Sequence, residues 1–76
     1  MDNNKVSFLI KKLQNNSATP DEKDEYMKYL LDEGKISESQ YRDYRKNRNN
    51  EDILKIAIIA GAAILLGWAI NELTKK

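Results

Sequence analysis

The sequence predicts an all-α protein, in which a small helical hairpin headpiece precedes one C-terminal transmembrane helix. The run from Ile56 to Ile70 contains no charged, amide or hydroxyl side chain. A helix that is apolar on every side must be enclosed by other protein or by lipid. Upstream, two helix-capping patterns separated by a glycine are typical of paired helices. We therefore divide the chain into a headpiece at 1–48 with helices at about 5–14, 20–33 and 38–47, a linker at 49–52, a transmembrane helix at 53–71 and a polar tail at 72–76.

The composition excludes several classes of function. With 76 residues and a formal net charge of +1, the chain has room for one small unit and carries no overall field that favours nucleic acid. It has no cysteine and no histidine, which removes sulfur nucleophiles, disulfides and the usual neutral-pH base and metal ligand. The sequence also has no phosphate-binding glycine loop and no metal-ligand pattern. We expect no enzymatic activity, no catalytic or metal site and no cofactor.

The first predicted helix, at about 5–14, has one apolar face, formed by Val6, Leu9, Ile10 and Leu13. Asn3 or Asn4 is placed to cap its N-terminus. Phe8 lies off this face among lysines, which indicates a second contact or docking on a membrane surface.

Two capping boxes define the hairpin that follows. Thr19 and Glu22, with proline at the first helical position, open the helix at 20–33. Gly34 is expected to end that helix with a positive φ, and Ser37 and Gln40 then open the helix at 38–47. We expect the hairpin core to consist of Tyr26, Leu30, Leu31, Ile36, Tyr41 and Tyr44.

The hairpin sequence LLDEGKISESQYRDYRKNR resembles the SHOCT domain, a short helical hairpin, over residues of about 28–48. In that family the hairpin usually closes the C-terminus of a larger protein, whereas here a predicted membrane helix follows. The stretch from Thr19 to Leu31 is also similar to the N-terminal cytoplasmic helices of iron-dicitrate-type anti-sigma regulators. Both resemblances imply an interaction module rather than an enzyme. The SHOCT pattern is carried by Leu30, Leu31, Gly34, Ile36, Ser37, Tyr41 and Lys46.

The predicted span is close to the minimum length for crossing a bilayer. The 18 residues from Ile53 to Ile70 rise about 27 Å, against a hydrocarbon core of about 30 Å. Lys55 can extend its ammonium group to the headgroups, and Trp68 is expected to be an interface anchor. The alternative is a buried core helix of a soluble protein. Asn50 is placed to cap the span, although the third helix could instead continue straight into it.

Two sets of residues near the span are candidate sites. The first is a helix-packing face of small residues, and its alternative is the general abundance of glycine and alanine in membrane helices. The second is a juxtamembrane set of cations, which outnumbers Lys75 and Lys76 beyond the span and places the N-terminus inside. These cations either bind anionic lipid or form a solvated face that sets topology alone. The packing face is Ala57, Ala60, Gly61, Ala63 and Gly67; the cations are Arg42, Arg45, Lys46, Arg48 and Lys55.

These features predict a single-pass, tail-anchored membrane protein with its N-terminus on the cytoplasmic side, or on the corresponding face of a virion membrane. We expect a structural or interaction subunit of a larger membrane assembly, in a bacterial complex or a membrane-containing phage virion. Its expected partners are the lipid bilayer and other membrane or membrane-proximal proteins, or further copies of itself, and not nucleic acid. The alternatives are a holin-like protein that oligomerises in the bilayer and a membrane-tethered cytoplasmic regulator.

Overall fold

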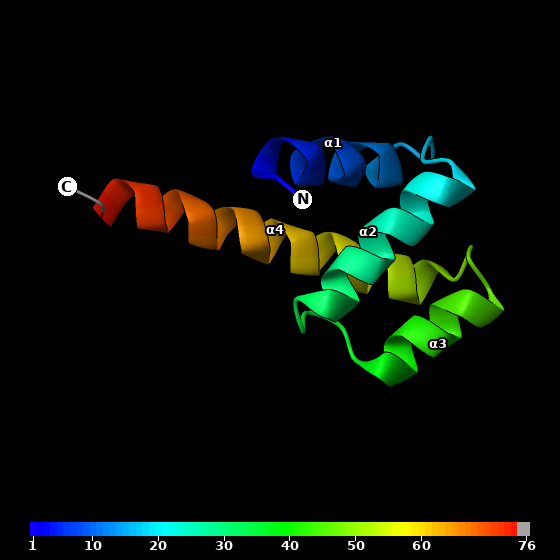
Figure 1. Cartoon of the computed structure of the whole chain (residues 1–76). Helices are drawn as coiled ribbons and strands as arrows, with labels where there is room; N and C mark the ends of the chain where they lie inside the picture. Colours follow the sequence, from blue (N-terminus) through cyan, green and yellow to red (C-terminus); the bar gives the residue numbers. More distant parts are fainter. Residues whose placement is uncertain (75–76) are drawn as a thin grey trace.

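The computed structural model describes residues 1–74, which form four α-helices and no strand. The helices are α1 (Asn3–Gln14), α2 (Pro20–Asp32), α3 (Glu38–Lys46) and α4 (Glu51–Thr74). Helices α1 to α3 lie around the first half of α4, which then extends beyond them as a single rod (Figure 1). The predicted all-α fold class is confirmed, and α4 is long and apolar enough to span a membrane.

Helix α1 lies alongside the first half of α4 and runs in the opposite direction (Figure 1). Its N-cap is Asp2, whose Oδ1 accepts a hydrogen bond from the backbone N–H of Lys5 at 2.8 Å. The expected caps, Asn3 and Asn4, are instead the first two residues of the helix, so that prediction is wrong. An aspartate side chain satisfies the free N–H groups as well as asparagine does, and its charge complements the helix dipole.

Both predicted capping boxes are confirmed. The Thr19 hydroxyl accepts from the Glu22 N–H at 3.1 Å, and the Glu22 carboxylate accepts from the Thr19 N–H at 2.9 Å. Ser37 and Gln40 make the equivalent pair of bonds at the start of α3, at 3.0 and 2.8 Å. Between them Gly34 has φ +70°, the left-handed conformation expected where α2 ends. The sequence chemistry alone therefore sets the hairpin's ends to within a residue.

Helix α3 does not continue into α4. It ends at Lys46, and residues 47–50 turn the chain before α4 begins at Glu51. Asn50 caps α4 as expected, because its Oδ1 accepts from the N–H groups of Asp52 at 3.1 Å and Ile53 at 3.3 Å. The continuous rod considered from the sequence is therefore excluded.

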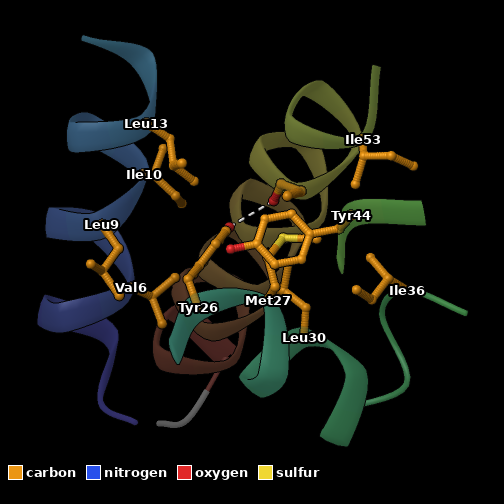
Figure 2. Packing of buried hydrophobic residues seen from close by; sticks show 11 residues of the cluster. Val6, Leu9, Ile10, Leu13, Tyr26, Met27, Leu30, Ile36, Tyr44 and Ile53 are labelled. Carbon is orange, nitrogen blue, oxygen red and sulfur yellow. Dashed lines mark hydrogen bonds between the residues drawn. The ribbon is translucent and has the colours of Figure 1, made fainter. Parts of the chain in front are cut away.

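The hydrophobic core is shared between the headpiece and α4 (Figure 2). Core residues therefore come from both sides of the linker expected at 49–52, and α4 begins within that range, at Glu51. Helix α1 has more of its contacts with α4 than with α2, so α1 would have little to pack against without α4. Of the expected hairpin core, Leu31 and Tyr41 are only partly buried. The buried set is Val6, Leu9, Ile10, Leu13, Tyr26, Met27, Leu30, Ile36, Tyr44, Ile53 and Ala57.

Candidate functional site

The two halves of α4 have different surroundings, although both are apolar. In the first half Ile53, Ala57 and Gly61 recur every four residues and are buried against the headpiece. In the second half Leu66 and Trp68 are exposed, Trp68 by 50% of its surface. Ile64 and Leu65 are half-buried and still pack against the core. Beyond them α4 projects past the other helices (Figure 1). The projecting part, residues 66–73, is called the apolar tip below.

Tyr26 makes a close contact between the headpiece and α4. Its side chain is fully buried, and its hydroxyl donates a hydrogen bond of 2.6 Å to the carbonyl oxygen of Ala57 (Figure 2). Burial raises the pKa of this hydroxyl, so it stays protonated and able to donate. A Cβ added to Gly61 would overlap the Tyr26 hydroxyl and lie 2.8 Å from Cδ1 of Ile10. A glycine is needed here because the headpiece approaches the helix backbone directly.

The predicted helix-packing face is therefore divided by the structure. Ala57 and Gly61 lie against this chain's own headpiece, and Ala60 is half-buried beside them. Ala63 and Gly67 are exposed, and a Cβ added to Gly67 would meet nothing within 4 Å. Small-residue spacing identified the side of α4 where a close approach occurs, but not the helices that make it.

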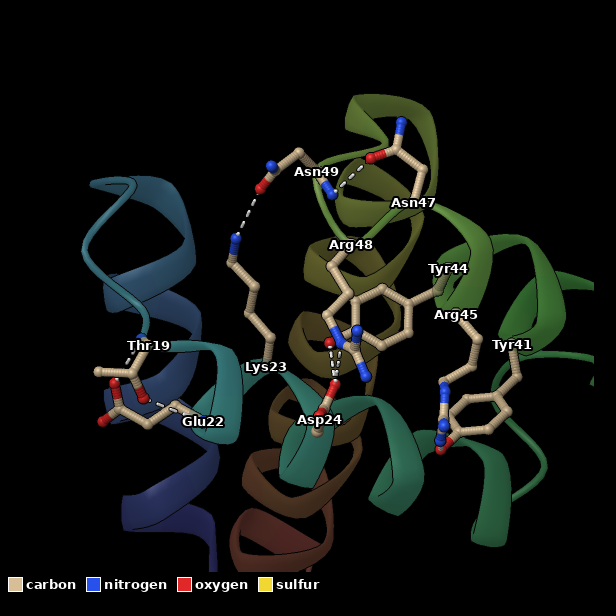
Figure 3. Close-up of polar contacts among 10 residues, drawn as sticks. All are labelled: Thr19, Glu22, Lys23, Asp24, Tyr41, Tyr44, Arg45, Asn47, Arg48 and Asn49. Carbon is tan, nitrogen blue, oxygen red and sulfur yellow. Dashed lines mark hydrogen bonds and ion pairs between the residues drawn. The ribbon is translucent and has the colours of Figure 1, made fainter.

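A polar cluster joins α2 to the segment that leads into α4 (Figure 3). The Asp24 carboxylate accepts from the Tyr44 hydroxyl at 2.6 Å and from Nε of Arg48 at 2.9 Å. These two hydrogen bonds, first that of Arg48, lower the pKa of Asp24. Burial and the bond to Asp24 raise the pKa of Tyr44. Next to this cluster, Lys23 donates to Asn49 Oδ1 at 3.1 Å, so α2 contacts the 47–50 turn at two points.

The predicted juxtamembrane cations lie at the end of the molecule opposite the apolar tip. Arg42 and Lys46 are exposed on α3, which lies beside the first turns of α4 (Figure 1). The Arg45 guanidinium carbon lies 5.9 Å from the Tyr41 ring centroid, and Arg48 pairs with Asp24 as described. Lys55 is exposed on α4. Lys75 and Lys76, to which these cations were compared, lie outside the described residues.

Ion pairs between α1 and α2 were not foreseen from the sequence. Lys5 Nζ lies 2.7 Å from the Glu25 carboxylate, and Lys12 Nζ lies 3.3 Å from that of Glu22. The hydrogen bond with Glu25 raises the pKa of Lys5. Lys12 also lies 5.1 Å from the centroid of the Phe8 ring, which is half exposed and lies off the apolar face of α1. Charges separated by many residues of sequence give no pattern that links them in advance.

An open groove of about 380 Å³ lies between the C-terminal end of α1 and the start of α4. Both aliphatic and polar side chains line it, and the charged ones are Glu51 and Lys55. Within residues 1–74, no three or more aspartate or glutamate side chains are grouped to hold a metal ion. The remaining lining residues of the groove are Leu13, Gln14, Asn16, Leu54 and Ile58.

Comparisons of the chain with protein-family models, curated proteins and solved structures found no match. The resemblances to the SHOCT hairpin and to anti-sigma regulators therefore stay predictions from the sequence. What the fold defines is a class: an all-α protein whose C-terminal helix is long and apolar enough to cross a membrane.

Proposed function

We propose that this chain is a small single-pass membrane protein that acts as an interaction subunit of a larger membrane assembly. In this proposal α4 is the span, the N-terminus is on the cytoplasmic side, and the helical headpiece meets the neighbouring protein. The partners are the bilayer, other membrane or membrane-proximal proteins, or further copies of the chain. No catalytic role is assigned to any residue.

The apolar tip is the observation that carries this proposal. Its exposed side chains include Leu66, Trp68 and Leu73, the last with 75% of its surface exposed. Leu66 and Leu73, seven residues apart, lie on one side of the helix and Trp68 lies on nearly the opposite side, so no single protein face of ordinary size would cover all three. Lipid encloses a helix from every side, and Trp68 is of the residue type that collects at membrane interfaces. Insertion of α4 into a bilayer accounts for this surface.

The charge distribution supports the orientation. Arg42, Arg45 and Lys46 lie with α3 at the end of the molecule away from the apolar tip. Cations that flank a span are retained on the cytoplasmic side. They also favour an anionic leaflet by about 1 kcal/mol each when near its surface.

The exposed side of α4 favours one alternative, a holin-like protein that oligomerises in the bilayer. Ile59, Ala63 and Leu66 are exposed on one side of the helix, with spacings of four and three residues. That spacing and the small residue in the middle suit packing against a second apolar helix. Self-association through this side would make copies of the chain the principal partner.

The test is crosslinking of the full-length protein within the membranes of its source, followed by mass spectrometry. We expect the protein to resist extraction by alkaline carbonate and to crosslink to different proteins. Crosslinks among copies alone, together with growth arrest on expression, would favour the holin-like alternative. Release by carbonate would contradict the membrane proposal itself.

Orientation is tested with a pair of charge-reversal variants. Arg45→Glu with Lys46→Glu should weaken the N-inside orientation, measured by protease accessibility of the N-terminus in intact cells. Lys28→Glu with Lys35→Glu makes the same change in charge at exposed hairpin sites farther from α4 in the sequence, and should leave orientation unchanged. Equal behaviour of the two variants would contradict the charge argument.

A further inference from the structure

The packed structure and a complete membrane span require the same part of α4. A span needs about 20 apolar residues to cross about 30 Å of hydrocarbon. The apolar tip, at 66–73, rises only about 12 Å, which is less than half of that thickness. The remainder must come from the segment that contains Ile53, Ala57 and Gly61, and the headpiece covers that segment.

The headpiece cannot accompany this segment into hydrocarbon. Helix α1, which lies along it, is joined to α2 by the ion pairs Lys5–Glu25 and Lys12–Glu22. The carboxylate of Asp24, with Arg48, lies at the start of the same segment. Ionised side chains at this depth in a bilayer are strongly unfavourable, even as pairs. A complete span and a packed headpiece therefore exclude each other.

We propose that the headpiece and the bilayer compete for the first half of α4, so that complete insertion displaces α1 from it. In the packed form, which is the structure described, the headpiece shields Ile53, Ala57 and Gly61 from water. In the inserted form lipid replaces the headpiece along this segment. This inference rests on the proposed function in one respect, namely that α4 enters a membrane.

When α1 is displaced from α4, its apolar face is exposed to water unless another surface buries it. That face holds Val6, Leu9, Ile10 and Leu13, whereas exposed Phe8 lies off it, among the lysines. Lysines 5, 11 and 12 flank the same helix. An amphipathic helix with lysines on its polar side binds in the plane of an anionic bilayer surface. The released α1 therefore lies on the membrane, at the base of the inserted α4.

The contact of Tyr26 with Ala57 and Gly61 determines how readily the packed form opens. A Cβ on Gly61 overlaps the Tyr26 hydroxyl in the packed form but meets only lipid in the inserted form. Gly61→Ala should therefore favour insertion, with about a tenfold lower lipid concentration at half-conversion. Gly67→Ala is the matched control, because it makes the same change in the same helix where nothing lies within 4 Å. The Gly67→Ala variant measures the effect of the higher helix propensity of alanine, which both substitutions introduce.

Conversion is followed with spin labels in the full chain, which has no native cysteine. Labels at Lys11→Cys on α1 and Ala62→Cys on α4, both exposed positions, report the distance between the two helices. Vesicles of phosphatidylcholine and phosphatidylglycerol at three to one serve as the membrane. A third variant, Leu73→Cys, reports whether the end of α4 reaches the vesicle lumen, through labelling by a thiol reagent enclosed there.

We expect one narrow distance in buffer, and a longer and broader distribution once vesicles are added and Leu73→Cys becomes labelled from the lumen. Lumenal labelling with an unchanged distance would overturn the competition while leaving the membrane proposal intact. An unchanged distance with no lumenal labelling, but with a blue shift of Trp68 fluorescence, would show half-insertion and also overturn it. No response of Trp68 to vesicles would overturn both proposals. If Gly61→Ala and Gly67→Ala reached half-conversion at the same lipid concentration, the contact with Tyr26 would not control the opening of the packed form.

Discussion

The first and second halves of α4 have similar compositions and different environments. Each half contains isoleucine, leucine, alanine and glycine, and neither shows a polar side. Ile53, at 6% exposure, is part of the headpiece core, whereas Leu66, at 63%, projects past it. A helix that is apolar on every side must be shielded from water, but its sequence alone does not show whether protein or lipid shields it. In the first half that cover is the same chain, and in the second we propose that it is lipid.

The largest expected effect comes from removing a buried isoleucine from the first half of α4. Ile53→Ala should lower the free energy of unfolding by about 2–5 kcal/mol, because it leaves a cavity between α4 and the headpiece. The measurement is urea unfolding in dilute buffer, followed by near-ultraviolet circular dichroism. Ile59→Ala is the control, since Ile59 is 69% exposed on the same helix, and it should change stability by less than about 0.5 kcal/mol. Equal losses would contradict the assignment of the first half to the core.

The next largest effect is expected at the contact between Gly61 in the first half of α4 and Tyr26 in the headpiece. Gly61→Ala should cost about 1–3 kcal/mol of packed-form stability, because its Cβ overlaps the Tyr26 hydroxyl. In a Tyr26→Phe background the hydroxyl is gone, so the same substitution should cost less. A double-mutant cycle by urea unfolding measures this coupling. Additive effects would show that the two residues do not meet.

A smaller effect is expected at the turn of the hairpin. Gly34→Val should destabilise the headpiece by about 1–2 kcal/mol, because a β-branched residue is strained at φ +70°. Thermal unfolding provides the measurement, and Gly34→Asn, a residue that tolerates this conformation better, should lose less. The fluorescence of Trp68 in the apolar tip should stay unchanged below the transition. A melting temperature that is the same in all three proteins would contradict the turn assignment.

The smallest effect concerns acid. Asp24 has a lowered pKa in the folded chain, so its contribution to stability is present above its unfolded value of about 3.9 and is lost as the pH falls below it. The midpoint of urea unfolding should therefore decline between pH 5 and pH 3. Asp24→Asn should reduce that decline, whereas Asp43→Asn, an exposed carboxylate on α3, should not. The same decline in both variants would place the acid sensitivity elsewhere.

The helix ends of the hairpin could be predicted from the sequence because their chemistry is local. Thr19, Ser37 and Asn50 each cap a helix through bonds to residues two or three positions ahead, and Gly34 takes the left-handed conformation that glycine adopts without steric cost. One such prediction was wrong. Asp2 caps α1 in place of Asn3 or Asn4, within the two-residue uncertainty that is usual for helix ends.

The docking of α4 could not be predicted, because a helix that is apolar all round has no periodic signal for its buried side. The spacing of Ala57 and Gly61 marked a side capable of close approach, but the partner, Tyr26, is separated from them by more than 30 residues. The cluster of Asp24, Tyr44 and Arg48 likewise depends on the packing of three separate segments. Such contacts arise only once the chain has folded, and no local sequence pattern predicts them.

Residue-resolved hydrogen exchange of the full chain, without and then with the anionic vesicles, tests the central claim most directly. Without vesicles we predict slow exchange for amides from Ile53 to Gly61 and throughout the apolar face of α1, and faster exchange in the apolar tip. With vesicles the apolar tip should become protected, while the protection of α1 changes as it leaves α4. Uniform protection along α4 in buffer, or an α1 that exchanges identically in both conditions while the tip inserts, would contradict the account.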